Sequence, residues 1–375
     1  MNELFMKKIA TYSLAIAVIF STVYVHGQLG LVQKDIALIQ NTALLASTSP
    51  SVDTQSKVLL LGGKDNSASR NDVFSSTGMQ TWTTIVANNA QNTAMWSPRV
   101  NANTIYFDNK YWVIGTSHWN SPSNNINSPN DIWSSVDGIN WKYVTGKPPF
   151  NNYYAPFTND FEGYYEYRAV VLGEKMFVIG GKPGNNNKAV VWSSADGIRW
   201  EVVNAATPFE NRTLFSVTAF NGKMYVIGGR YSMNAYGNSG VWSSTDGGTW
   251  TQVNAAPEFS NYLSDAKTLV FNNKIYLLGG LYQTTTNGYQ SAKVWASSNG
   301  ANWSLVNTTL PDASHTSFST RDAIVSDGKI WLGSATYNGV ANKLWSSSDA
   351  LTWTQNRMTP QWSMRFGYRF ISKNK

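Results

Sequence analysis

Short apolar runs separated by turn residues recur along the chain from residue 57 onward. In each recurrence one apolar run ends in a turn and a lysine, and a second run follows at once and ends in glycine. Residues 168–181 and 216–229 show this pattern clearly. Two apolar runs joined by Gly-Glu or Asn-Gly predict a tight β-hairpin.

A second hairpin follows in each unit and carries the most regular repeat of the sequence. The third run contains an aromatic residue, and a tryptophan lies eight positions later, beyond a turn that often contains Asp-Gly. Four strands per unit, with a period of 50 to 59 residues, are typical of a propeller blade. We therefore expect six blades, with the repeated rings packed between neighbours. The pairs are Phe74 and Trp82, Trp133 and Trp141, Trp192 and Trp200, Trp242 and Trp250, Trp295 and Trp303, and Trp345 and Trp353.

The first unit lacks its own opening strand, because residues 57–63 follow a linker and not an apolar run. Residues 368–375 match residues 168–175 position for position and supply the missing strand. Pairing the last strand with the first blade closes the ring and covers an exposed sheet edge. The predicted fold is therefore all-β: a six-bladed β-propeller of four-stranded antiparallel blades, closed by the C-terminal strand in the first blade.

The second and fourth strands of the units resemble the kelch repeat, also found in the central domain of galactose oxidase. The matching features are the glycine pair, the fourth-strand tryptophan and a ring residue three positions before the glycines, at Phe177, Tyr225 and Tyr276. The resemblance covers residues 57–375. Two units depart from it, with Gly115-Thr116 and Gly333-Ser334 in place of the glycine pair.

A weaker resemblance links the Ser-x-Asp-Gly-x-x-Trp phrase to the Asp-box of sialidases, which has one more residue before the tryptophan. The galactose oxidase resemblance does not imply that enzyme's copper chemistry, because its site depends on a tyrosine linked to cysteine. This chain has no cysteine.

The N-terminal residues predict export. Lys7 and Lys8 precede an uncharged stretch, and Val25-His26-Gly27 suits signal peptidase. Residues 1–27 are expected to be a cleaved signal peptide or a retained membrane anchor. Residues 28–56 are expected to form a helical stalk and linker, with a partner-binding helix as the alternative. The body, residues 57–375, is then secreted, periplasmic or on the cell surface.

The net charge of +7 does not by itself indicate nucleic-acid binding. Six of the lysines occur one per unit, just before the second strand. This regular placement indicates a scaffold role for them and argues against a basic patch. His118 and His315 lie on loops far apart in sequence, and no further ligands converge on them, so no metal and no cofactor is expected. The repeated lysines are Lys57, Lys110, Lys175, Lys223, Lys274 and Lys329.

Binding is expected on the face opposite the hairpins, because the loops there vary most in length. The largest insert, residues 146–167, mixes eight aromatic residues with amides and carboxylates, which suits sugar rings. The alternative is a loop folded onto its own rings. Phe150 recurs as Phe209 and Phe259, each followed two positions later by asparagine, so that part of the insert is predicted to be scaffold.

The innermost strand of every unit begins with a polar residue, seven positions before the hairpin lysine. This pattern predicts a wet channel mouth, and nearby arginines favour a cationic entrance for a carboxylate or sulfate. Solvated strand ends without a ligand are the alternative. The polar positions are Asn103, Arg168, Ser216, Lys267, Asp322 and Tyr368. The candidate ligand-binding residues are Tyr164, Glu166, Arg168, Arg212, Lys267, Arg321, Asp322 and Tyr368.

The favoured function is an exported binding module for a glycan or a cell-surface protein, with no nucleic-acid partner and no membrane contact beyond an N-terminal anchor. The alternative follows from a further resemblance, in size, blade number and signal, to the sialic acid mutarotases. It implies an acid–base pair drawn from Glu166 or Asp322 beside Arg168 or Arg321. No catalytic residue is assigned on the binding hypothesis. A sialidase is disfavoured because no nucleophile and acid can be placed.

Overall fold

The computed structural model describes residues 57–65, 68–89, 95–115, 131–146, 148–151, 167–180, 188–209, 212, 214–229, 240–259, 263–283, 288–290, 293–311, 322–334, 342–359 and 365–373. The chain divides into two compact units, Met1–Thr54 and Gln55–Lys375. The predicted signal and stalk lie outside the described residues. No helix within those ranges has the length and apolar character needed to cross a membrane.

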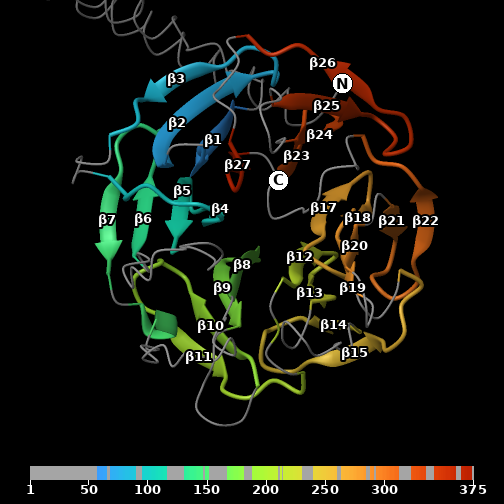
Figure 1. Cartoon of the computed structure of the whole chain (residues 1–375). Helices are drawn as coiled ribbons and strands as arrows, with labels where there is room; N and C mark the ends of the chain where they lie inside the picture. The colour runs from blue at the N-terminus through green and yellow to red at the C-terminus, as the bar shows by residue number, and fades with distance from the viewer. Residues whose placement is uncertain are drawn as a thin grey trace, which may run out of the picture. The chain divides into compact units, whose positions relative to one another are not determined.

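The second unit contains six four-stranded antiparallel sheets in its described part, and Figure 1 shows them following one another around a ring. Each sheet is one blade, and its four strands run outward from the centre in chain order, except in blade 1. Blade 1 contains β27 (Arg369–Ser372), β1 (Lys57–Lys64), β2 (Ser69–Thr77) and β3 (Thr83–Val86). Blade 2 contains β4 (Asn103–Phe107), β5 (Lys110–Ile114), β6 (Ile132–Ser135) and β7 (Lys142–Thr145).

Blades 3 to 6 repeat this arrangement. Blade 3 contains β8 (Tyr167–Leu172), β9 (Lys175–Gly180), β10 (Val190–Ser194) and β11 (Glu201–Asn204). Blade 4 contains β12 (Ser216–Phe220), β13 (Lys223–Ile227), β14 (Val241–Ser244) and β15 (Thr251–Asn254). Blade 5 contains β17 (Lys267–Phe271), β18 (Lys274–Leu278), β21 (Val294–Ser297) and β22 (Ser304–Asn307). Blade 6 contains β23 (Asp322–Ser326), β24 (Lys329–Ser334), β25 (Lys343–Ser347) and β26 (Thr354–Asn356).

Two smaller features lie in the connections between these strands. A three-stranded sheet joins β16 (Leu263–Ser264), β19 (Leu281–Gln283) and β20 (Gly288–Gln290), and a 3-10 turn, η1, spans Pro149–Asn151. The innermost strands β27, β4, β8, β12, β17 and β23 contact one another in sequence around the centre (Figure 1). The predicted six-bladed architecture is therefore confirmed.

The predicted closure is confirmed, with a register that differs by one residue from the sequence alignment. β27 pairs antiparallel with β1, and Phe370 lies opposite Leu60 and Ile371 opposite Leu59. Arg369 lies opposite Leu61, as Arg168 lies opposite Ile179 in blade 3. Arg369, and not Tyr368, therefore occupies the first polar position of the inner strand. In the other five blades a two-residue hairpin turn fixes this register, whereas β27 arrives without one.

Glycines in the outer hairpins of blades 2 to 5 let each of these blades contact the blade before it. A Cβ on Gly300 would lie 2.1 Å from the ring of Tyr225, and one on Gly197 would lie 2.3 Å from Trp112. In blade 1 the matching position is Met79, which is fully buried at a φ of 67° and shares a core cluster with Trp331 of blade 6. At the junction between blades 6 and 1, the long side chain of Met79 therefore fills the space that a closely approaching backbone fills at the glycine-containing junctions.

The repeated aromatic residues are scaffold, as expected. Phe209 packs edge-on against Trp250 at 5.1 Å between ring centroids, and Phe259 does the same with Trp303 at 5.2 Å. Phe150 packs in the same way against Trp200, at 5.1 Å. Each of these three phenylalanines is buried. Their recurrence is explained by this packing.

The outer hairpin turns of blades 2 to 6 share one hydrogen-bond pattern. In blade 6, Ser347 donates to Asp349, and the backbone N–H groups of Leu351 and Thr352 donate to the same carboxylate at 2.8 Å. The Thr352 N–H group, followed by that of Leu351, lowers the pKa of Asp349 from 3.8 to about 2, although burial opposes the shift. Asn299 makes the matching backbone bonds in blade 5 without a charge.

Candidate ligand-binding collar

Six polar residues occupy one matched position at the start of the inner strands, and we call them the collar. Each lies opposite the residue four positions after the second-strand lysine, as Asn103 lies opposite Ile114 and Ser216 opposite Ile227. The matched position recurs six times, so the collar surrounds the centre of the ring (Figure 1). In blade order the collar residues are Arg369, Asn103, Arg168, Ser216, Lys267 and Asp322.

The uncharged collar residues join neighbouring inner strands. The Asn103 side-chain amide donates to the Tyr167 carbonyl at 3.3 Å and accepts from the Ala169 N–H at 3.3 Å. The Ser216 hydroxyl donates to the Ala266 carbonyl, immediately before β17. Both side chains are buried. They satisfy backbone groups of the next blade and fix the spacing of the inner strands.

Lys267 and Asp322 form an ion pair between blades 5 and 6, with 2.5 Å between Nζ and Oδ1. The second carboxylate oxygen of Asp322 accepts the Phe370 N–H at 2.7 Å, so this side chain also bridges to blade 1. Asp322 is 1% exposed and Lys267 33% exposed. The carboxylate is therefore enclosed by the scaffold, while its cationic partner reaches solvent.

The two collar arginines are half-buried. Arg168 donates from Nε to the Phe215 carbonyl at 3.2 Å, and its guanidinium lies 5.9 Å from the centre of the Phe215 ring. Arg369 donates to the Tyr368 carbonyl at 3.0 Å. Each guanidinium has five N–H donors in a rigid fork, and these contacts orient the group at the collar.

Charge is distributed unevenly around the collar. Arg369, Asn103 and Arg168 lie on blades 1, 2 and 3 and include two cations and no carboxylate; we call them the cationic arc. The remaining collar residues lie on blades 4, 5 and 6 and carry one cation paired with one carboxylate; we call them the neutral arc. An anion at the collar would therefore be attracted mainly to blades 1 to 3.

Three further arginines are inserted between blades, each four positions before a collar residue. Arg99, Arg212 and Arg365 are all buried. Arg212 donates to the carbonyls of Gly228 and Gly240, at 3.0 and 3.3 Å. Arg99 pairs with Asp131 at 2.7 Å. We call these the junction arginines, because each is bound to groups of the blade that follows it.

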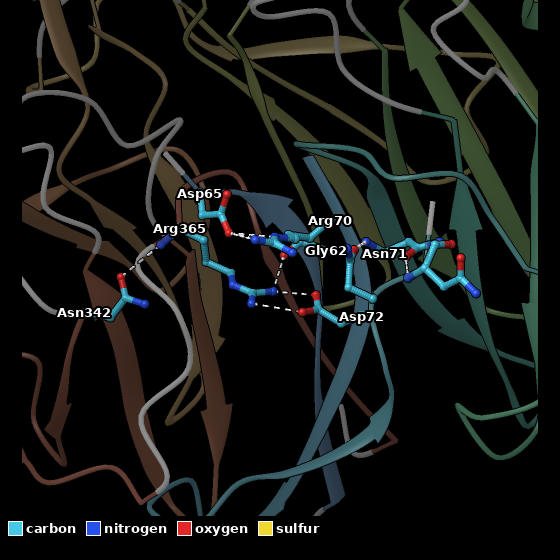
Figure 2. Close-up of polar contacts among 9 residues, drawn as sticks. Gly62, Asp65, Arg70, Asn71, Asp72, Asn342 and Arg365 are labelled. Carbon is cyan, nitrogen blue, oxygen red and sulfur yellow. Dashed lines mark hydrogen bonds and ion pairs between the residues drawn. The ribbon is translucent and has the colours of Figure 1, made fainter. Parts of the chain in front are cut away.

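Figure 2 shows the junction arginine at the closure of the ring. Arg365 makes two hydrogen bonds with the carboxylate of Asp72, at 2.6 and 3.0 Å, and one with the Gly62 carbonyl at 3.1 Å. Asp65 and Arg70 form a second ion pair beside it. Arg365 is 2% exposed and Asp72 9% exposed, so this paired charge stabilises the join between the two ends of the propeller.

The structure places the predicted site residues in different settings. Arg168, Lys267 and Asp322 lie together in the collar. Arg212 and Tyr368 are buried, Arg212 as a junction arginine and Tyr368 in the core between blades 6 and 1. Tyr164, Glu166 and Arg321 lie outside the described residues, as do His118 and His315. Ligand binding by the predicted residues remains a prediction.

Sequence reasoning missed Arg369 and the role of the junction arginines. A spacing of four residues links Arg99 to Asn103, Arg212 to Ser216, and Arg365 to Arg369. That spacing was the available signal, and it would have corrected the register of the last strand. Within the described ranges, no three His, Cys, Asp or Glu side chains gather in a way that could hold a metal ion.

Comparisons with known proteins agree with the fold. A family model described as the DUF6242 beta propeller domain matches residues 154–264. The solved structure of YjhT is similar to this chain, with a TM-score of 0.53 and 14% sequence identity, over 82% of this chain and 99% of that one. No match was found among curated proteins. The chain therefore has the β-propeller fold that its kelch resemblance implies, and the particular similarity to galactose oxidase is not confirmed.

Proposed function

We propose that this kelch-like propeller is an exported binding module that holds an acidic glycan at the cationic arc of its collar. One observation carries the proposal: on three consecutive blades, two half-buried arginines flank an amide and no carboxylate belongs to that part of the collar. A guanidinium group binds a carboxylate or sulfate through paired N–H donors. The acidic group of the glycan would therefore be bound by Arg168 and Arg369.

The scaffold contacts of the arc support this role. Arg168 is oriented by the Phe215 carbonyl, Arg369 by the Tyr368 carbonyl, and Asn103 holds β4 against β8 between them. A binding group that is already oriented loses less conformational entropy when its ligand arrives. The insert at residues 146–167, between blades 2 and 3, is predicted to provide aromatic and amide groups that contact the sugar ring.

The alternative function is sugar processing of the sialic acid mutarotase type, which needs a carboxylate that can exchange protons beside an arginine. Asp322 suits that role poorly, because it is 1% exposed and its two oxygens bind Lys267 and the Phe370 N–H. Glu166 would have to provide the acid–base group. Glu166 lies immediately before β8 in the sequence, which is compatible with either function. Substituting this residue therefore distinguishes the binding module from the mutarotase.

The test is a glycan array probed with the full chain and with two variants, Arg168→Gln and Arg369→Gln. We expect binding to glycans that carry carboxylate or sulfate groups, and a loss of at least about tenfold in each variant, because each removes one charge-assisted contact. Arg199→Gln is the control, because Arg199 is exposed in the β10–β11 hairpin and outside the collar. Its binding should match the wild type.

Other outcomes would point elsewhere. Equal binding of neutral and acidic glycans, or equal binding by all four proteins, would overturn the cationic-arc proposal. If the chain bound a protein ligand and no glycan, the glycan part of the proposal would be wrong, although the cationic arc could still be the binding site. For the enzyme alternative, exchange between the anomers of a sialic acid should be followed by NMR. Acceleration that is lost in Glu166→Gln would favour the mutarotase.

A further inference from the structure

The inner hairpin of blade 4 turns through Asn221-Gly222, an exposed pair between β12 and β13. Phe220 pairs directly with Lys223 across the turn, and the two turn residues have positive φ, of 46° and 71°. This is the two-residue hairpin turn that asparagine and glycine favour. Nothing lies within 4 Å of a Cβ placed on Gly222, so the tip of the hairpin projects into open space.

An Asn-Gly pair can react with itself. The backbone nitrogen that follows an asparagine can attack the side-chain amide, and glycine permits this best because it has no Cβ to obstruct the five-membered ring that forms. The reaction is intramolecular, so its rate depends on whether the two groups can reach the geometry of attack. The sequence has such pairs at Asn221, Asn287, Asn299 and Asn338, and Asn287 and Asn338 lie outside the described residues.

Blade 5 contains the same pair under restraint, in its outer hairpin. Asn299 Oδ1 accepts the backbone N–H groups of Ala301 and Asn302, each at 2.9 Å. The nitrogen that would attack, that of Gly300, donates to Ser297 Oγ at 2.8 Å. Gly300 is also buried. These contacts fix both reacting groups, so the pair at Asn299 is protected by the fold.

The turn of blade 4 lacks these restraints. Within the described ranges, neither the Asn221 side chain nor the Gly222 N–H has a hydrogen-bond partner. The scaffold does not need this pair, because the matched turns of blades 5 and 6 use residues 272–273, Asn-Asn, and 327–328, Asp-Gly, at similar φ. Asn221 therefore combines the reactive sequence with freedom to rotate at an exposed tip.

We propose that Asn221 is a site of spontaneous deamidation in the folded protein. The Gly222 nitrogen forms a bond to Cγ of Asn221, the bond from Cγ to the side-chain nitrogen breaks, and ammonia leaves with the Gly222 amide proton. Water then opens the ring at one of its two carbonyls and leaves aspartate or isoaspartate at position 221. Both products place a carboxylate where the fresh chain has a neutral amide.

The isoaspartate product alters the hairpin. It adds a carbon atom to the backbone between β12 and β13, where the length of the turn fixes the register of the two strands. The other end of β12 carries the collar residue Ser216, whose hydroxyl donates to the Ala266 carbonyl of the next blade. Isoaspartate at position 221 should therefore weaken the inner hairpin that spaces blades 4 and 5, whereas aspartate keeps the turn.

The test is peptide mapping by mass spectrometry of the full chain after incubation in mildly alkaline buffer. Cleavage after lysine and arginine places Asn221 in residues 213–223, as the single asparagine of that fragment. We expect Asn221 to react at least about ten times faster than Asn299 in the folded chain. In urea the two pairs should react at similar rates, because the fold no longer protects Asn299.

Gly222→Ala should slow the reaction at Asn221 by at least about tenfold, because the added methyl group obstructs ring formation. Gly328→Ala is the matched control: it changes the same turn position in blade 6, at a φ of +69° with nothing within 4 Å, and should leave the rate at Asn221 unchanged.

Three results would overturn the proposal. Asn221 that stays intact in the folded chain while it reacts in urea would show that the turn prevents deamidation. Equal folded-state rates at Asn221 and Asn299 would show that the contacts of the blade 5 turn give no protection. Thermal unfolding of the separated isoaspartate form at the temperature of the fresh chain would refute the effect on the inner hairpin.

Discussion

The outer hairpins and the collar recur at equally regular intervals, but they differ in how much their residues vary. The hairpin turns of blades 2 to 6 use one design, in which serine and Asp or Asn bind the same backbone groups. The collar positions instead hold arginine, asparagine, serine, lysine and aspartate. Both regions join neighbouring blades, so their contribution to folding does not explain the difference.

This difference separates what the scaffold requires from what it permits. A turn that packs against the next blade must reproduce one geometry, and few residues tolerate its positive φ. A collar position needs only one polar contact across the junction, and several side chains can provide it. Variation in charge at the collar is therefore compatible with the fold and available for ligand recognition. Changes in the repeated contacts should affect stability, and changes in the collar should affect binding.

The largest effect is expected at the ring closure. Arg365→Met should lower the free energy of unfolding by about 3 to 5 kcal/mol, because it leaves the Asp72 carboxylate buried without its cation. Urea denaturation measures the change. Adding Asp72→Asn to this variant should recover part of the loss. A loss below about 1 kcal/mol would show that the ion pair does not hold the closure.

Gly300→Ala should cost about 3 kcal/mol, because the new methyl group would lie 2.1 Å from the Tyr225 ring at a φ of +75°. Gly222→Ala is the control: its φ is +71° and nothing lies within 4 Å of the added methyl. The control should cost about 1 kcal/mol, the strain of the left-handed conformation alone. Equal losses in the two variants would mean that close packing between blades 4 and 5 adds little.

The collar arginines should contribute much less to stability. Arg369→Gln removes a hydrogen bond to the Tyr368 carbonyl from a half-buried side chain, and should change the free energy of unfolding by about 1 kcal/mol. The same variant should lose acidic-glycan binding on the array. A loss of stability as large as that of Arg365→Met would contradict the division between scaffold and collar.

The smallest effect concerns pH. The pKa of Asp349 is lowered in the folded state, from 3.8 to about 2, and those of Asp196 and Asp246 are also lowered. Each carboxylate therefore stabilises the fold above its unfolded pKa, and this contribution is lost as pH falls from about 4 toward about 2. Asp349→Asn should reduce the slope of stability against pH in that range. At neutral pH the variant should be less stable than the wild type, because it lacks the charge-assisted part of these hydrogen bonds, and the two proteins should unfold alike at about pH 2.

Much of the fold followed from the sequence, because Trp192 and Trp200 and their counterparts recur at matched strand positions. Six copies of a weak pattern fix strand number and blade number where one copy would not. The register of β27 could not be predicted in the same way. Without a hairpin turn, it depends on the burial of Tyr368 and on the pairing of Arg365 with Asp72, which are contacts between the two ends of the propeller.

The candidate site was less accessible to sequence reasoning. The polar inner-strand positions were recognised, but whether Arg212 or Arg168 lies in the collar depends on side-chain direction across a blade junction. Arg212 turns into the next blade and binds Gly228 and Gly240, whereas Arg168 stays at the start of β8.

The joining of β27 to β1 also constrains when this protein can finish folding. The first blade of the nascent chain has three of its four strands until β27 has been made, and five complete blades cannot form a ring without it. If the chain crosses a membrane starting from its N-terminus, the first sheet must wait beyond that membrane with an open edge. During that interval a short peptide with the sequence of residues 365–373 should compete for the vacant strand position and trap the ring before it closes.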